Sequence, residues 1–198
     1  VRLIAPTKLQ MLVVNGKYLP SKRKSIDFEI AASKNDLKLF SSINDSNNDG
    51  FSGKLKLKKS IIKTDSLWNL NAIADVNYIQ KDFKTIERLF NIEFNRDWNL
   101  DPPTNGQIFN ESGNQTYLIS GIEAIHPKKG IAAYQFEHLE FTGDFNGNRH
   151  VGLLNLNLNS LNIFSNSSYL TTSSNLSSST FLRSFNRLVY NFNRGWMG

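Results

Sequence analysis

An alternating segment near the middle of the chain constrains the fold more than any other feature. Between Leu67 and Ile79 the sequence reads Leu-Trp-Asn-Leu-Asn-Ala-Ile-Ala-Asp-Val-Asn-Tyr-Ile. Because successive side chains of a β-strand point to opposite faces, this segment has one apolar face and one largely polar face. The apolar positions are Trp68, Leu70, Ala72, Ala74, Val76 and Tyr78. The polar positions are Asn69, Asn71, Asp75 and Asn77.

Aromatic residues bracket this apolar row. From Trp68 to Tyr78 the strand spans roughly 33 Å at ~3.3 Å per residue. Tilted by about 45°, it would extend ~23 Å along a membrane normal, close to the ~25 Å apolar band of a transmembrane β-barrel. Strands of soluble β-sandwiches also alternate, so the pattern leaves both classes open.

Composition narrows the chemistry. The 198 residues contain no Cys, which excludes disulfides, thiolate nucleophiles and Cys-ligated zinc. The net charge of +6 comes mostly from scattered Lys and Arg. Lys54, Lys56 and Lys58 share one strand face, which fits a solvated face or a wet barrel lumen better than a nucleic-acid site.

The ends of the sequence suggest a piece of something longer. There is no initiator Met and no charged segment followed by an apolar signal sequence. No run of about 18 apolar residues occurs, so no transmembrane helix is predicted. We therefore expect residues 1–198 to form one β-meander or barrel segment that is incomplete at both ends.

Turn-forming residues divide the chain into strand-like runs. We expect strands over 8–19, from 26, over 51–62, 67–80, 116–125 and 131–141, one long run over 151–170, and a last one over 181–193. Residues 143–148 and 173–179 are predicted turns, 84–100 is predicted as a strand, and 101–115 as a long polar loop. The predicted fold class is all-β, an antiparallel meander of eight or nine long strands, because no convincing crossover helix occurs.

Motifs for catalysis or metal binding are weak. Residues 45–50 match the first half of a calcium-binding EF-hand loop, but Lys56 stands where the bidentate Glu is required. His126, His138 and His150 lie in or near predicted turns or strands without metalloprotease spacing. No nucleophile elbow or phosphate-binding loop occurs. We predict no catalytic residues, no metal and no cofactor.

A mixed-charge cluster is the main candidate for a polar site. It comprises Glu87, Arg88, Glu93, Arg96, Asp97 and Trp98. Such residues could form a salt-bridge ladder in a barrel lumen, or a ligand subsite with Trp98 as a stacking platform. Ordinary cross-strand ion pairs with a rim aromatic are the favoured interpretation.

Long alternating strands, the aromatic-bracketed row, polar loops, abundant Asn and the lack of Cys resemble the outer-membrane β-barrel class of Gram-negative bacteria. The resemblance implies a non-catalytic structural, transport or surface-display role in the cell outer membrane. Trp68, Leu70, Ala72, Ala74, Val76 and Tyr78 would then face lipid. Asn69, Asn71, Asp75, Asn77, Glu87, Arg88, Arg96 and Trp98 would face the lumen or a ligand.

The expected partners are the lipid bilayer and other envelope proteins, without nucleic acid. The alternative is a soluble, secreted or periplasmic β-sandwich or curved sheet that binds glycans or proteins. Poor alternation over 116–125 and 131–141 keeps this alternative open.

Overall fold

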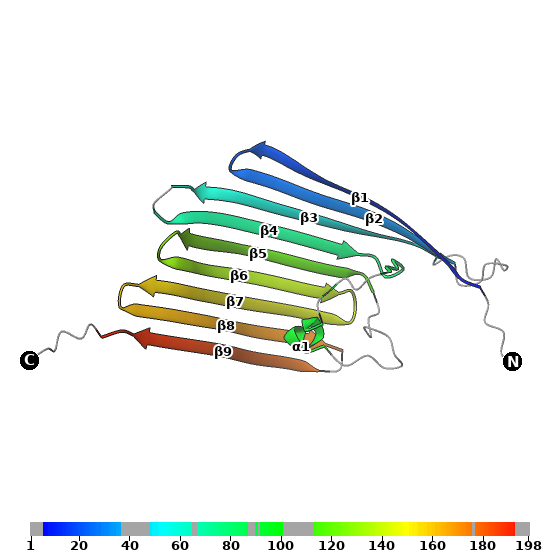
Figure 1. Ribbon diagram of the computed structural model, residues 1–198. Coiled ribbons are helices and arrows are strands. Elements are labelled where there is room, and N and C mark those ends of the chain that lie inside the picture. Colours follow the sequence, from blue (N-terminus) through cyan, green and yellow to red (C-terminus); the bar gives the residue numbers. More distant parts are fainter. Residues whose placement is uncertain are drawn as a thin grey trace, which may run out of the picture.

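The fold is one nine-stranded antiparallel sheet (Figure 1). The computed structural model describes residues 6–36, 48–64, 67–86, 90, 92–100, 113–175 and 177–192. Spatial order follows chain order, and each strand pairs with its sequence neighbours. The strands are β1 (Lys8–Ser21), β2 (Lys24–Asp36), β3 (Asp49–Ile62), β4 (Asn69–Ile79), β5 (Gln115–His126), β6 (Gly130–Phe141), β7 (Phe145–Leu158), β8 (Leu161–Ser174) and β9 (Ser178–Tyr190). The predicted all-β meander is confirmed.

The two ends of the sheet carry different connections. At one end, here called the short-turn end, β1 joins β2, β3 joins β4, β5 joins β6 and β7 joins β8. At the opposite end, the long-connection end, β2 joins β3, β4 joins β5, β6 joins β7 and β8 joins β9. The connection between β4 and β5 contains the only helix of the described residues, α1 (Phe94–Trp98).

The sheet is a single open layer. Within the described residues β1 and β9 each pair with one strand only, and no second sheet packs on either face. Both faces of β1 and β9 are almost entirely exposed. An isolated sheet normally buries at least one face against another layer. No helix in the described part of the chain is long and apolar enough to cross a membrane.

Several predicted boundaries are wrong. The strand predicted over 84–100 is wrong for its described residues, 84–86, 90 and 92–100, which contain no strand and include α1, because Phe94 and Trp98 are both buried at helical spacing. The single run over 151–170 is two strands joined at Asn159, whose φ of 51° permits the tight turn. The pattern hid this turn because Leu158 and Leu161 pair directly and share a face.

Two other boundaries shift. The turn predicted over 143–148 is shorter, since β7 begins at Phe145, whose ring packs 5.5 Å from that of Phe141. Of the polar loop predicted over 101–115, residues 101–112 lie outside the described residues and Gln115 already belongs to β5.

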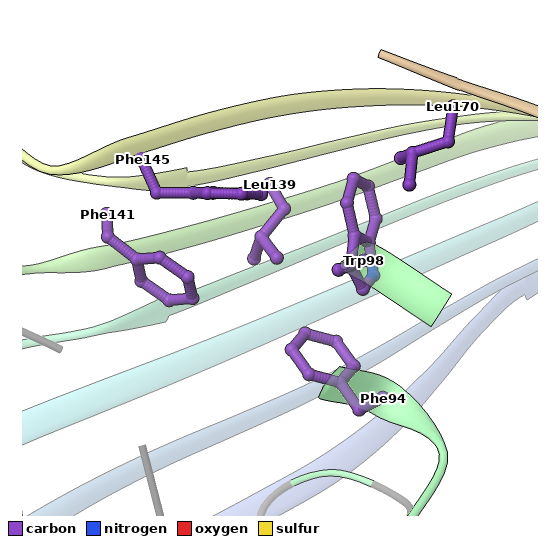
Figure 2. Packing of buried hydrophobic residues seen from close by; sticks show 6 residues of the cluster. All are labelled: Phe94, Trp98, Leu139, Phe141, Phe145 and Leu170. Carbon is purple, nitrogen blue, oxygen red and sulfur yellow. The ribbon is translucent and has the colours of Figure 1, made fainter. Parts of the chain in front are cut away.

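A small core lies at the long-connection end, on one face of the sheet. Trp98 and Phe94 of α1 pack against strand side chains from β6, β7 and β8 (Figure 2). The strand residues are Leu139, Phe141, Phe145 and Leu170. A second cluster joins Ala31, Ile79 and Phe83 nearer β2.

Candidate functional site

The strand pairing divides the sheet into two unlike faces. Directly paired residues point to the same side, so the register assigns every strand residue to a face. We name the face that carries Val76 and its paired neighbours the apolar face. The face that carries Asn77 and its paired neighbours is the polar face.

The apolar face extends across all nine strands. Most of the exposed large hydrophobic strand residues lie on it: Leu12, Val14, Tyr18, Phe28, Ile30, Phe51, Leu55, Leu57, Ile62, Val76, Ile122, Tyr134, Leu154, Leu158, Tyr169, Leu182, Leu188 and Tyr190. Eight interstrand spacings of ~4.8 Å and a band ~25 Å tall give roughly 1,000 Å². This exceeds the ~300–600 Å² that is the largest exposed apolar patch of a typical soluble monomer.

The residues singled out on β4 segregate as the alternation indicates. Leu70, Ala72, Ala74, Val76 and Tyr78 lie on the apolar face. Trp68 precedes β4, and its ring lies 5.3 Å from that of His126, which is also on the apolar face. Asn69, Asn71, Asp75 and Asn77 lie on the polar face.

Three basic residues of β3, Lys54, Lys56 and Lys58, lie on the polar face among acidic residues. Lys56 is directly paired with Asp27 of β2 and Asp75 of β4. Lys54 is paired with Glu29. Lys58 Nζ lies 2.8 Å from Glu123 Oε1 of β5. Charges of both signs therefore alternate across this surface, which is typical of a solvated face and unlike a uniformly basic nucleic-acid site.

The polar face is covered at the long-connection end by α1. The indole of Trp98 is 1% exposed and lies against Gly147 of β7, where a Cβ would come within 2.9 Å of the ring. The ring of Tyr117 of β5 meets it edge-on at 5.8 Å. Gly147 thus forms the hollow that admits the indole, and Trp98 anchors the helix to the sheet.

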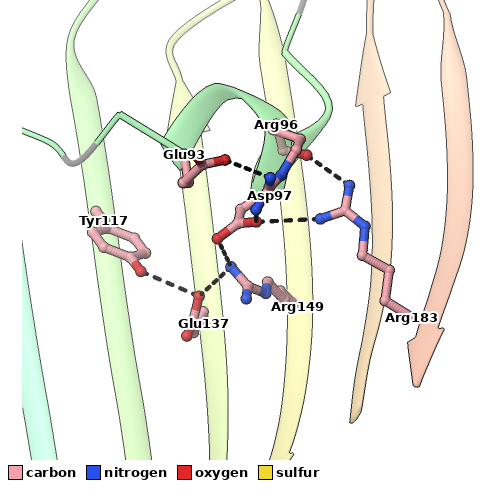
Figure 3. A network of polar contacts seen from close by, with 7 residues as sticks. All are labelled: Glu93, Arg96, Asp97, Tyr117, Glu137, Arg149 and Arg183. Atoms are coloured by element: carbon pink, nitrogen blue, oxygen red, sulfur yellow. Dashed lines mark hydrogen bonds and ion pairs between the residues drawn. The ribbon is translucent and has the colours of Figure 1, made fainter. Parts of the chain in front are cut away.

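Ion pairs surround this anchor (Figure 3). Asp97 Oδ2 lies 3.5 Å from Arg149 Nη1 of β7, and Asp97 Oδ1 lies 3.3 Å from Arg183 Nη1 of β9. Arg183 Nη2 also donates a hydrogen bond of 2.7 Å to the carbonyl oxygen of Arg96. One carboxylate of α1 therefore holds arginines from two strands.

The network continues beneath α1. Arg149 Nη1 also lies 3.7 Å from Glu137 Oε2 of β6. The hydroxyl of Tyr117 donates to the same Glu137 oxygen at 3.1 Å. Burial raises the pKa of the Glu137 carboxyl, and Arg149 and the Tyr117 hydroxyl offset this effect only in part.

The same β4–β5 connection also attaches near the opposite edge of the sheet. The backbone N–H of Lys84 donates to Ser33 Oγ of β2 at 2.9 Å. The backbone of Phe83 occupies the space that a Cβ at Gly50 would need. At its other end, Asn99 Nδ2 donates to Ser179 Oγ of β9 at 3.2 Å. Its described residues thus contact the polar face from β2 to β9, and we call residues 80–86, 90 and 92–100 of this connection the strap.

The strap revises the expected mixed-charge cluster. Glu93 and Arg96 pair within the strap at 2.7 Å. Glu87 and Arg88 lie outside the described residues. Trp98 is a buried packing residue, so its ring is not an open platform for stacking a ligand.

Sequence reasoning missed the strand partners of this cluster. Tyr117, Glu137, Arg149 and Arg183 come from four different strands, and only the pairing register brings them together. One signal was available in the sequence. Tyr117, Leu139 and Phe141 break the alternation of β5 and β6 on the polar face because the strap covers them.

The three histidines make local contacts on the apolar face. His126 Nδ1 accepts hydrogen bonds from the backbone N–H groups of Lys128 and Lys129 in the following turn. His138 contacts Asn148 at 2.9 Å, and His150 contacts the hydroxyl of Tyr134 at 2.7 Å. Among the described residues no group of three His, Asp or Glu side chains could hold a metal ion.

Comparisons with known proteins add no relative. No protein-family model, curated protein or solved structure matches this chain.

Proposed function

We propose that this chain forms a non-catalytic segment of the wall of an outer-membrane β-barrel, with a structural, transport or surface-display role. Its partners would be the lipid bilayer and neighbouring envelope proteins. One observation carries the proposal. A single-layer sheet of nine long strands presents a predominantly apolar face on one side and a charged, amide-rich face on the other.

In this arrangement the apolar face contacts lipid and the polar face contacts water. Trp68, Leu70, Ala72, Ala74, Val76 and Tyr78 would face lipid. Asn69, Asn71, Asp75 and Asn77 would face the lumen. A membrane strand satisfies its backbone hydrogen bonds through its neighbours, so the edges of β1 and β9 would pair with further strands in the assembled wall.

The strap would then lie on the lumen side of the wall. It contacts strands from β2 to β9 near the long-connection end. A segment in that position narrows the wet space beside the sheet, which favours a restricted passage or a filled interior.

A soluble curved sheet that binds glycans or proteins is the second candidate. The small core under the strap favours it, because buried aromatic clusters of this kind also stabilise soluble domains. It would leave the apolar face in water, however. The described strands also form one sheet, so they do not form a two-sheet sandwich.

Partitioning of the purified chain between buffer and a non-ionic detergent tests the proposal, with electrophoresis before and after boiling. We expect recovery only with detergent and a change of mobility on boiling, because a membrane sheet resists dodecyl sulfate until heated. A monodisperse monomer in detergent-free buffer would contradict the proposal and favour the soluble sheet.

A further inference from the structure

The apolar residues do not run straight across the sheet. A reference row of directly paired residues on the apolar face makes this visible. It consists of Lys24, Lys59, Ala72, Ile122, Tyr134, Gly152, Ser167 and Ser184. On β2 the apolar side chains lie on the long-connection side of this row, from Ile26 to Ala32. On β7 they lie on the short-turn side, from Leu154 to Leu158.

Aromatic side chains mark both borders of the band, and both borders are oblique. Near the long-connection end, Phe51 of β3 lies eight residues from the reference row, whereas Tyr169 of β8 lies two residues from it on the same side. Near the short-turn end, Tyr18 of β1 is level with Ile26, two residues to the long-connection side of the row. Tyr190 of β9 lies six residues to the short-turn side. Both borders therefore shift by about one residue per strand.

The hairpin tips at the short-turn end shift by the same amount. The β1–β2 hairpin ends at the reference row, where Ser21 pairs with Lys24. The last pairs of the next three hairpins lie two, four and six residues to the short-turn side of the reference row. The shift is therefore one residue per strand. These pairs are Ile62–Leu70, His126–Gly130 and Leu158–Leu161. Connections and apolar side chains thus follow one oblique line, although nothing in the chemistry of a turn requires this.

A tilted sheet in a flat bilayer explains the coincidence. A shift of one residue, ~3.3 Å, per strand spacing of ~4.8 Å corresponds to a tilt of about 35°. Strands of transmembrane barrels tilt by about 35–45°. On β4 the residues from Trp68 to Tyr78 then span ~27 Å along the normal, and on β8 and β9 the band spans ~22 Å.

We infer that the apolar face is built for a bilayer with an apolar core of about 25 Å, crossed by strands inclined about 35° to the normal. The inference rests on the proposed function and adds the depth of each residue. Lys24 and Lys59 lie at the short-turn border, and Thr171 and Thr180 at the other border. Such a core is thinner than the ~30 Å average and agrees with a bacterial outer membrane.

Polar residues interrupt the band on β8 and β9 but satisfy one another. Ser165 Oγ donates to Asn186 Oδ1 at 2.6 Å, and the hydroxyls of Ser167 and Ser184 lie 2.9 Å apart. Paired hydroxyl and amide groups cost less in an apolar medium than unpaired ones.

Three single-cysteine variants test the inclination, because the chain contains no native Cys. The variants are Leu57→Cys, Leu182→Cys and Leu188→Cys. Positions 57 and 182 lie on one row of directly paired residues. Positions 57 and 188 lie on one line parallel to the oblique borders of the band. Leu182 and Leu188 are matched controls, since both lie on β9 with similar exposures of 72% and 69%. Each variant carries a thiol-attached fluorophore in phosphatidylcholine vesicles with twelve-carbon chains. Lipids with nitroxides at two depths act as quenchers.

We expect equal quenching depths at positions 57 and 188, and a shallower depth at 182, which lies about 5 Å farther from the middle of the band. If positions 57 and 182 have equal depths and position 188 has a different one, the strands are not inclined as inferred, but the proposed membrane location stands. Arg187→Cys on the polar face reports exposure to aqueous iodide. If all three apolar-face probes are quenched by iodide as strongly as this one, both the inclination and the proposed function fail.

Discussion

The indole of Trp98 lies over Gly147, where a Cβ would come within 2.9 Å of the ring. Gly147→Ala should therefore displace the indole or shift β7. Overpacking of this kind costs about 1–3 kcal/mol of unfolding free energy. Urea titration in detergent micelles, followed by circular dichroism, measures the loss.

Gly152→Ala is the matched control for this substitution. Gly152 lies on the same strand, but its nearest neighbour to a new Cβ is the carbonyl oxygen of Ser167 at 4.0 Å. We expect little change in stability. Equal destabilisation by the two variants would argue against Gly147 as the hollow that admits Trp98.

Asp97→Asn should weaken the attachment of α1. It removes the charge that faces Arg149 and Arg183, and the Arg149 side chain is only 18% exposed. Arg149 keeps Glu137 at 3.7 Å, so the variant removes one of its two carboxylates, for a loss of about 1–3 kcal/mol. Near-ultraviolet circular dichroism of Trp98 should report the loosened helix. Asp49→Asn affects an exposed pair with Lys34 at 3.8 Å and should cost about 0–1 kcal/mol. If Asp97→Asn costs no more stability than Asp49→Asn, Asp97 does not hold α1 on the sheet.

Ser33→Ala tests the attachment of the strap to β2. The variant removes the acceptor of the Lys84 N–H at a buried position, for a loss of about 1–2 kcal/mol. Hydrogen exchange at the Lys84 amide should accelerate. Ser25→Ala, on the same face of β2, should leave that exchange rate unchanged, and an unchanged rate in both variants would show that this hydrogen bond does not hold the strap.

Ala74→Arg and Asn77→Arg separate the two faces of β4. If the apolar face contacts lipid, Ala74→Arg near mid-band should cost about 2–4 kcal/mol. Asn77→Arg places the same charge in the wet lumen, directly opposite Lys54, and should cost about 1 kcal/mol or less. Unfolding in vesicles gives both values. A soluble sheet would tolerate both substitutions about equally, so similar costs would count against the membrane assignment.

Much of the architecture was predictable from the sequence. The period of two over 67–79 correctly predicted β4 and the segregation of its side chains, since the alternation of a strand is a local property. Turn residues indicated most of the hairpins. The turn at Asn159 was missed because the Leu–Asn alternation continues through it.

The strap was not predictable in the same way. The aromatic spacing of Phe94 and Trp98 is compatible with a strand or a helix, and burial against Gly147 favours the helix. The broken alternation of β5 and β6 was visible, but its cause was not. It becomes clear once α1 is seen to cover Tyr117, Leu139 and Phe141.

The sequence by itself determined that this chain forms long antiparallel strands with unlike faces, because alternation and turn chemistry act over a few residues. Only the tertiary structure decided how these strands are staggered, and therefore that their apolar side chains form one oblique band. It also decided that Asp97 lies between Arg149 and Arg183, residues far apart in the chain. Register and long-range packing depend on all nine strands together, and no local pattern contains that information.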